Sequence, residues 1–246
     1  MAKITWAGQS CFQISVTASK ETCDIVIDPF DEKIGLKMPN FSADVVLVSH
    51  GHPDHNNVKG VKGNPRTKGA EQSSHDGSPR TKEAEQSSHD GSPFIIDNLG
   101  EYEKNGVFVQ GIDSFHDDVE GKERGRNTIF IIEAEDMRFC HLGDFGQKQL
   151  TDEQLDKIGH VDILMIPVGG TYTISAHEAT KVIGQIEPKM VIPMHYALPK
   201  MKTDVEGVDI FLKAMGKKEI TAQDKLTIKA SLLPKESEME IVVLKN

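Results

Sequence analysis

The sequence predicts an α/β fold in which layers of strands are combined with helices. The first half contains short β-branched runs, such as ADVVLV at residues 43–48, which are typical of strands buried on both faces. The second half alternates similar apolar runs with two capping boxes that mark helix starts. Elements of this kind pack in layers around one core. We therefore predict a single domain over residues 1–246, a length that can bury a substantial core.

The first half is expected to supply most of the strands. The run at 22–28 ends at Asp28 before Pro29, and the run at 43–48 ends at Ser49. Loops held by rigid strands are where functional groups gather. In chain order, the β-branched and apolar runs predict strands at residues 3–15, 22–28, 43–48, 94–96, 107–115, 128–134 and 137–141.

The second half is expected to place helices between further strands. The boxes that begin at Thr151 and Ser175 predict helices over residues 152–158 and from Ser175 to about Ile186. A third helix is predicted near 205–215. Buried strands are predicted at 162–168 and 188–193, and two closing strands near 225–230 and 238–244.

One segment differs from the rest of the chain. Residues 65–78 read PRTKGAEQSSHDGS and residues 79–92 read PRTKEAEQSSHDGS, so the copies differ only at Gly69 and Glu83. This polar composition, rich in Gly, Ser and Pro, cannot bury a core. We predict that residues 66–93 are a disordered tandem-repeat insertion, of period 14, in a surface loop.

Composition narrows the possible partners and the location. The net charge of −10 disfavours nucleic acid, and the densest basic group, Lys122, Arg124 and Arg126, is interpreted as a solvated turn. No apolar run reaches the roughly 18 residues that a membrane span requires. Three scattered cysteines and the lack of a secretory signal indicate a cytoplasmic protein. We expect a small-molecule substrate and neither a nucleic-acid nor a membrane partner. The sequence leaves open whether the chain forms a homo-oligomer.

The stretch VSHGHPDHNN carries the strongest chemical pattern. His50, His52, Asp54 and His55 are four candidate metal ligands within six residues. Imidazoles and a carboxylate suit zinc, and also manganese or iron. Four ligands exceed what one metal needs from one loop, and two metals about 3.5–4 Å apart would use them. Three more candidates each follow a predicted strand: His116, Asp144 and His195.

This set resembles the pattern of the metallo-β-lactamase superfamily. The shared features are His-x-His-x-Asp-His after a buried strand, a distant His, an Asp in a Leu-Gly-Asp turn, and a last His. The resemblance covers nearly the whole chain apart from the repeat. The motifs IDPF, HLGD and PMHY are also similar to a branch of small metal-dependent hydrolases that includes L-ascorbate-6-phosphate lactonase-like proteins.

The resemblance implies an αββα sandwich with a site at one edge of its two sheets. It also implies two divalent metal ions, most simply zinc. The implied ligands are His50, His52 and His116 for the first metal, Asp54, His55 and His195 for the second, and Asp144 between the two.

We therefore predict a dinuclear metal-dependent hydrolase. Metal-bound hydroxide would attack a lactone, ester or amide carbonyl, or a phosphodiester, with Asp54 orienting the hydroxide or passing a proton to the leaving group. The alternatives are an iron-binding oxidoreductase-like protein and a non-catalytic metal-binding protein of the same fold. Three residues are candidate supports. Asp28 either fixes the tautomer of a ligand imidazole or caps a turn, His141 is either a core or a site residue, and Tyr196 is a candidate for the pocket wall.

Overall fold

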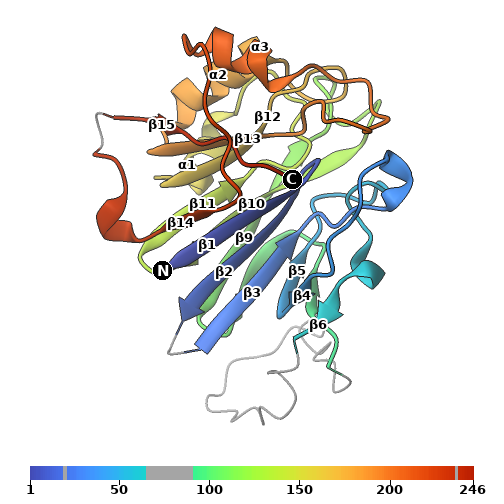
Figure 1. The fold of residues 1–246 in the computed structure, drawn as a ribbon, viewed down its shortest axis with the longest axis vertical. Coiled ribbons are helices and arrows are strands. Elements are labelled where there is room, and N and C mark those ends of the chain that lie inside the picture. The colour runs from blue at the N-terminus through green and yellow to red at the C-terminus, as the bar shows by residue number, and fades with distance from the viewer. Residues whose placement is uncertain (19–20, 65–90, 236–237) are drawn as a thin grey trace.

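The computed structural model describes residues 1–18, 21–64, 91–235 and 238–246, which form two β-sheets packed face to face (Figure 1). The first sheet is a six-stranded sheet in the order β14-β1-β2-β3-β5-β7. Because β5 is parallel to β3, the loops that follow these two strands leave the sheet at the same edge. The strands are β14 (Leu226–Ile228), β1 (Ala2–Gly8), β2 (Cys11–Ala18), β3 (Glu21–Ile27), β5 (Val45–Leu47) and β7 (Phe94–Ile96).

The second sheet is a seven-stranded sheet in the order β15-β13-β12-β11-β10-β9-β8. β11, β12 and β13 are mutually parallel, and β9 runs the same way because β10 is antiparallel to both β9 and β11. The carboxyl ends of β9, β11 and β13 therefore share one edge. The strands are β15 (Glu240–Ile241), β13 (Met190–Met194), β12 (Ile163–Pro167), β11 (Met137–His141), β10 (Arg126–Ala134), β9 (Val107–Phe115) and β8 (Gly100–Lys104).

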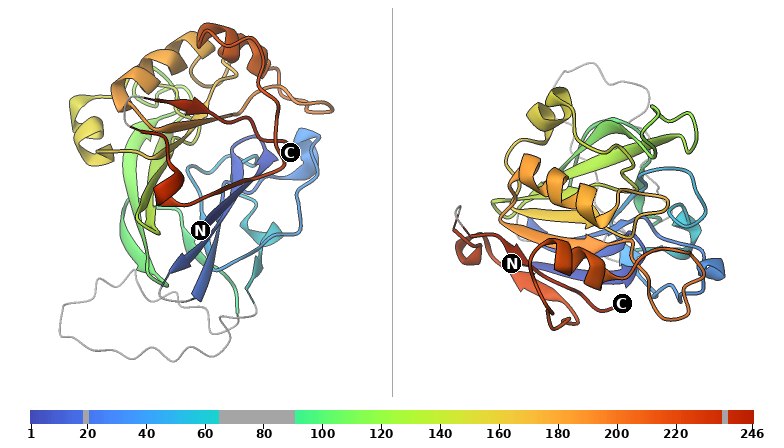
Figure 2. Two further views of the ribbon diagram at one scale, coloured as in Figure 1. Left: turned by 60° about the vertical axis from the view of Figure 1, so that its left-hand side comes forward. Right: turned by 90° about the horizontal axis from the view of Figure 1, so that it is seen from above.

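Three helices accompany the seven-stranded sheet and lie on its outer side (Figure 2). α1 (Asp152–Ile158) connects β11 to β12, and α2 (Ala176–Ile186) connects β12 to β13. Both begin at the predicted capping boxes, and α3 (Val208–Ala214) follows β13. None of the helices formed by the described residues has the length and apolar character that crossing a membrane requires.

In the first sheet, β5 is buried on both faces, as its β-branched run predicts. Val45 and Leu47 belong to the main core between the sheets, whereas Val46 packs on the other side in a second apolar cluster. That cluster includes Phe30 and Leu36, and a short two-stranded sheet, β4 (Ser42–Ala43) and β6 (Lys62–Gly63), stands beside it. The 3₁₀ turns η1 (Glu32–Ile34) and η2 (Val58–Gly60) contribute Ile34 and Val58 to its margin.

Some predicted elements differ from the structure. Residues 3–15 form two antiparallel strands rather than one, because the chain reverses between Gly8 and Cys11. The sequence interpretation missed β8, whose GEYEK lacks an alternating apolar pattern. β14 and β15 are shorter than predicted. The predicted disordered insertion at 66–93 falls almost entirely on residues 65–90, which lie outside the described part of the chain, and it stays a prediction.

Asp162 is a buried carboxylate at the start of β12. It accepts hydrogen bonds from Arg138 N at 2.8 Å and Lys189 Nζ at 2.9 Å, and His160 Nε2 lies 3.0 Å away. Burial tends to raise the pKa of Asp162, but the backbone donor of Arg138 and the side chains of Lys189 and His160 outweigh it and hold the pKa below its ordinary value. The ionised carboxylate therefore ties β11, β12 and the entry to β13 together.

Replacing Asp162 by asparagine is expected to destabilise the protein by about 2 kcal/mol at pH 7, because a neutral amide loses charge-assisted hydrogen bonds. A depressed folded-state pKa contributes stability above the unfolded pKa of about 4, and this contribution is lost as pH falls through the folded value. The difference between wild type and Asp162→Asn should therefore shrink in acid. Urea unfolding at pH 7 and near pH 3.5 measures it, with the exposed Asp156→Asn as control. A difference that stays constant across this range would contradict the assignment.

Candidate metal centre

The predicted ligands meet at the edge where the carboxyl ends of the parallel strands lie. His50, His52, Asp54 and His55 occupy the loop that follows β5 of the first sheet. The second sheet supplies the other three, which follow β9, β11 and β13: His116, Asp144 and His195. Packing the two sheets face to face brings residues far apart in sequence to one place.

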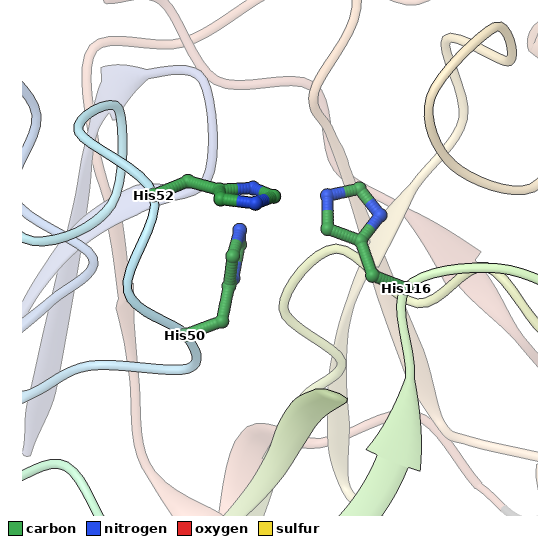
Figure 3. Close-up of side chains that lie close together, drawn as sticks. All are labelled: His50, His52 and His116. Atoms are coloured by element: carbon green, nitrogen blue, oxygen red, sulfur yellow. The ribbon is translucent and has the colours of Figure 1, made fainter. Parts of the chain in front are cut away.

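Three histidines form the first donor set, and Figure 3 shows their rings converging from the β5 loop and the end of β9. The ring centroids of His50 and His52 are 4.6 Å apart, and those of His50 and His116 are 4.9 Å apart. One ring nitrogen from each lies within 4.8 Å of the others. His52 is exposed, whereas His116 is buried. The set is therefore open to solvent on one side.

The second donor set consists of Asp54, His55, Asp144 and His195, whose donor atoms also lie within 4.8 Å of one another. Asp144 Oδ2 is 3.1 Å from His55 Nε2 and 3.3 Å from His195 Nε2. The same oxygen is 3.2 Å from His116 Nε2 of the first set. Asp144 thus touches both sets, as the predicted position between two metals requires.

Asp28 orients two of the histidines, His55 directly and His50 through Ser49. Its carboxylate accepts from Ser49 N and Ser49 Oγ, both at 2.7 Å, and His55 Nδ1 lies 3.1 Å from Oδ2. An ionised carboxylate only accepts, so the proton of His55 is on Nδ1 and its Nε2 faces Asp144. Because the Ser49 hydroxyl donates its hydrogen bond to Asp28, its oxygen accepts from His50 Nδ1 at 3.0 Å. Nε2 of His50 is then left without a proton.

The Leu-Gly-Asp turn fixes the central carboxylate. Asp144 N donates to Asn127 Oδ1 at 2.9 Å, and Ser10 Oγ donates to Asp144 Oδ1 at 3.0 Å. Gly143 has φ of +57°, and a Cβ there would lie 2.3 Å from Asn127 Oδ1, so only glycine fits. His141 accepts from Gly143 N at Nδ1 and donates from Nε2 to Ser10 O. It is a buried histidine that orders the turn.

Burial and the charges of neighbouring groups shift the pKa values of the cluster in different directions. Burial, helped by the charge of His55, lowers the pKa of His50 to about 3. Burial alone would lower the pKa of His55, but Asp144, Asp28 and Asp54 raise it well above its usual value. Burial opposes the ionisation of Asp144, yet the facing rings of His195, His55 and His116 hold its pKa well below the ordinary range. Ionised Asp144 beside neutral His50 has the protonation states that a divalent cation needs, and a cation that binds His55 must displace a proton from its ring.

The donor set also leaves buried ring nitrogens unused. Within the described residues, His50 Nε2, His55 Nε2, His116 Nδ1 and His195 Nδ1 are buried and make no hydrogen bond. Buried polar atoms are normally paired. Neutral imidazole nitrogens grouped with carboxylates suit zinc, manganese or iron, so these residues fit the predicted cations.

The sequence interpretation missed Gln9 and Ser10, in the turn between β1 and β2. Gln9 Nε2 donates to Asp54 Oδ2 at 3.0 Å and lies 2.9 Å from His195 Nε2. Neither residue belongs to a pattern that indicates metal binding. Tyr196 lies on the core side: its ring is 4.8 Å from that of Trp6 and its hydroxyl donates to Leu244 O at 3.5 Å.

A two-sheet sandwich with these histidines and aspartates at one edge defines a protein of the metallo-β-lactamase class. Residues 3–195 match the β-lactamase superfamily domain, and the chain belongs to that family. The predicted superfamily and the α/β sandwich are thus confirmed.

Named relatives agree with this assignment. A UPF0173 metal-dependent hydrolase of Thermococcus onnurineus is 29% identical over 226 residues, covering 89% of this chain and 94% of the relative. The Pyrococcus horikoshii counterpart is 28% identical over 213 residues, covering 84% and 90%. A solved Thermotoga maritima structure, assigned to the Zn-dependent hydrolases of the metallo-β-lactamase superfamily, is 32% identical with a TM-score of 0.69 and covers 100% of both chains. The lactonase-like branch stays a prediction.

Proposed function

We propose that this chain, a metal-dependent hydrolase like its named relatives, holds two divalent cations side by side and hydrolyses a small polar molecule. The observation that carries the proposal is Asp144 Oδ2, which lies 3.1–3.3 Å from ring nitrogens of both donor sets. A shared carboxylate fits cations about 3.5–4 Å apart, the spacing of two-metal hydrolases. The nitrogen-rich donors favour zinc, with manganese or iron as the alternatives.

The cations, when bound, would supply Lewis acidity toward a substrate oxygen and toward water. Asp54 is the carboxylate of the cluster that a substrate can reach. Its side chain is 28% exposed, against 3% for Asp144 and 0% for Asp28. Burial tends to raise the pKa of Asp54, but the hydrogen bond and positive charge of His55 hold it below its ordinary value. The ionised carboxylate would accept a hydrogen bond from water and orient it toward the substrate.

A small hollow of about 160 Å³ beside His116 is the proposed place for the part of the substrate that does not react. Its walls include Arg124, whose guanidinium lies 6.0 Å from the Tyr172 ring centroid. Two of its carboxylates are already engaged: Asp117 accepts four backbone N–H groups, and Glu178 caps α2. Two larger hollows, about 490 and 480 Å³, share no residue with the donor sets.

Arg124 brings a positive charge to the wall of this hollow, although the sequence predicted only a solvated turn for it. Replacing Arg124 by methionine is expected to raise KM about 10-fold while kcat changes less than about threefold, because a charge-assisted contact outside the reacting bond contributes uniform binding. Steady-state kinetics measures both constants on whichever substrate the turnover screen described below identifies. The matched control is Arg126→Met, because Arg126 pairs with Asp113 at 3.0 Å and does not line the hollow. An unchanged KM in Arg124→Met would rule out this position for the substrate.

The proposed function is tested by metal content and turnover together. Metal-free protein is loaded with Zn²⁺, Mn²⁺ or Fe²⁺, bound metal is measured by elemental analysis, and turnover is screened on glucono-δ-lactone, p-nitrophenyl acetate and bis-p-nitrophenyl phosphate. The lactone is included because of the lactonase-like motifs. We expect two equivalents of metal and turnover of one class that a chelator abolishes. Full turnover with one equivalent would contradict the two-cation proposal, and two equivalents without turnover of any ester, lactone or phosphodiester would favour a non-catalytic metal-binding protein.

A further inference from the structure

Gln9 lies between two donors that belong only to the second set. Its side chain is fully buried, and its Nε2 is 3.0 Å from Asp54 Oδ2 and 2.9 Å from His195 Nε2. Asp54 comes from the β5 loop and His195 from the end of β13. One amide nitrogen therefore connects donors supplied by the two sheets.

The chemistry of the neighbours fixes the orientation of this amide. The carboxylate of Asp54 can only accept, so the amide nitrogen of Gln9, and not its oxygen, faces Asp54. The same nitrogen then presents its second N–H to His195 Nε2, which must accept with a lone pair. His195 accordingly carries its proton on Nδ1 and turns an unprotonated Nε2 toward the centre.

Among the described residues, the other polar group against Nε2 of His195 is Asp144 Oδ2 at 3.3 Å, and a carboxylate, which only accepts, cannot select an unprotonated Nε2. The tautomer of His55 is set by Asp28 at Nδ1, and that of His50 is set by Ser49 at Nδ1. In contrast, His195 Nδ1 is buried and has no hydrogen-bond partner among the described residues. The usual outer contact that orients a ligand imidazole is missing here, and Gln9 acts from the opposite nitrogen.

Two hydrogen bonds to its carbonyl oxygen fix the backbone of Gln9. Its carbonyl accepts from Trp6 Nε1 and from His195 N, both at 3.0 Å. Gln9 and His195 both have φ of +52°, a conformation uncommon for residues with a side chain. Such conformations persist when the surroundings enforce them, and they concentrate at functional sites.

We propose that Gln9 is a positioning residue that sets the affinity of the second cation position without setting that of the first. The inference rests on the proposed two-cation function. When a cation takes the Nε2 lone pair of His195, the amide keeps its hydrogen bond to Asp54 and holds that carboxylate in place. The donors are thus arranged before the cation arrives. Ser10 is the natural comparison, because its hydroxyl donates to Asp144, which touches both sets.

The experiment is a zinc titration of metal-free protein in competition with a chromophoric chelator. For Gln9→Met, which keeps the side-chain length but removes the donors, we expect the second affinity to fall about 10-fold and the first to change less than about twofold. Ser10→Ala is expected to weaken both. Gln9→His, which restores a ring N–H, should recover most of the loss. A His52→Ala background identifies the second position, because His52 belongs only to the first set.

Equal weakening of both positions in Gln9→Met, an unchanged second affinity, or a tighter one would each overturn the inference. Near-ultraviolet circular dichroism of the metal-free variants verifies folding, and Gln9→Ala gives the same comparison if Gln9→Met does not fold. A different result would contradict the proposed function: the wild-type protein would bind only a single equivalent of zinc. Two equivalents in wild type with no effect of Gln9→Met would overturn this inference alone.

Discussion

Asp144→Asn is expected to weaken zinc binding at both positions by at least about 100-fold and to abolish hydrolysis. This loss should exceed the 10–100-fold that outer contacts to ligands contribute, because Asp144 Oδ2 faces His55, His116 and His195 directly. The neutral amide also leaves the charge of His55 less compensated. Competition titration with zinc and elemental analysis of the purified protein measure the effect.

The matched control is Asp224→Asn, an exposed aspartate that pairs with Lys245 at 3.0 Å. It should retain both zinc equivalents. If Asp144→Asn still bound two equivalents with wild-type affinity, Asp144 would not lie between the cations. Full activity of a metal-depleted His52→Ala variant would contradict the two-cation proposal as a whole.

Metal removal is expected to lower the melting temperature by about 10 °C relative to protein in zinc at about 1,000 times its Kd. A ligand that binds only the folded state contributes about 4 kcal/mol at that excess, and a chain of this size shifts by about 2–4 °C per kcal/mol. The structural reason is the cluster of ionised carboxylates and unpaired ring nitrogens that the chelated protein must bury. Differential scanning calorimetry with zinc and with chelator measures the shift.

Two histidine variants serve as controls for the thermal shift. His52→Ala should reduce it, because it removes a donor from the first set. His177→Ala, on the exposed face of α2, should leave it unchanged. Identical melting temperatures in zinc and in chelator would mean that the cluster does not bind zinc in the folded protein.

The donor residues could be predicted because they lie in loops that follow apolar strands. Parallel strands bring their carboxyl ends to one edge, so Asp144 after β11 and His195 after β13 had to approach each other. Gln9 and Ser10 could not be found in this way. They are polar turn residues, and their role depends on how the β1–β2 turn of one sheet meets the ends of β13 and β11 of the other.

The fold shows the same division between local and long-range information. α1 and α2 begin where their capping boxes predict, because capping is decided within four residues. β8 was missed because its side chains are mostly exposed, and only pairing with β9 makes it a strand. The sequence predicts one strand over residues 3–15 because no Asn-Gly or similar pair marks the turn at Gln9, whose φ is positive.

Because the donors come from both sheets, they emerge at different times during synthesis of the chain. The loop with His50 and His52 leaves the ribosome early, but His195 follows β13, about 140 residues later in the chain. A nascent chain that has made only the first strands carries the donors of that loop without the partners that follow β9, β11 and β13. The complete centre can form only after β13 has joined β12. We therefore expect metallation to be a late step of maturation, and a chain that stalls before β13 to lack the donors of the second set that follow β11 and β13.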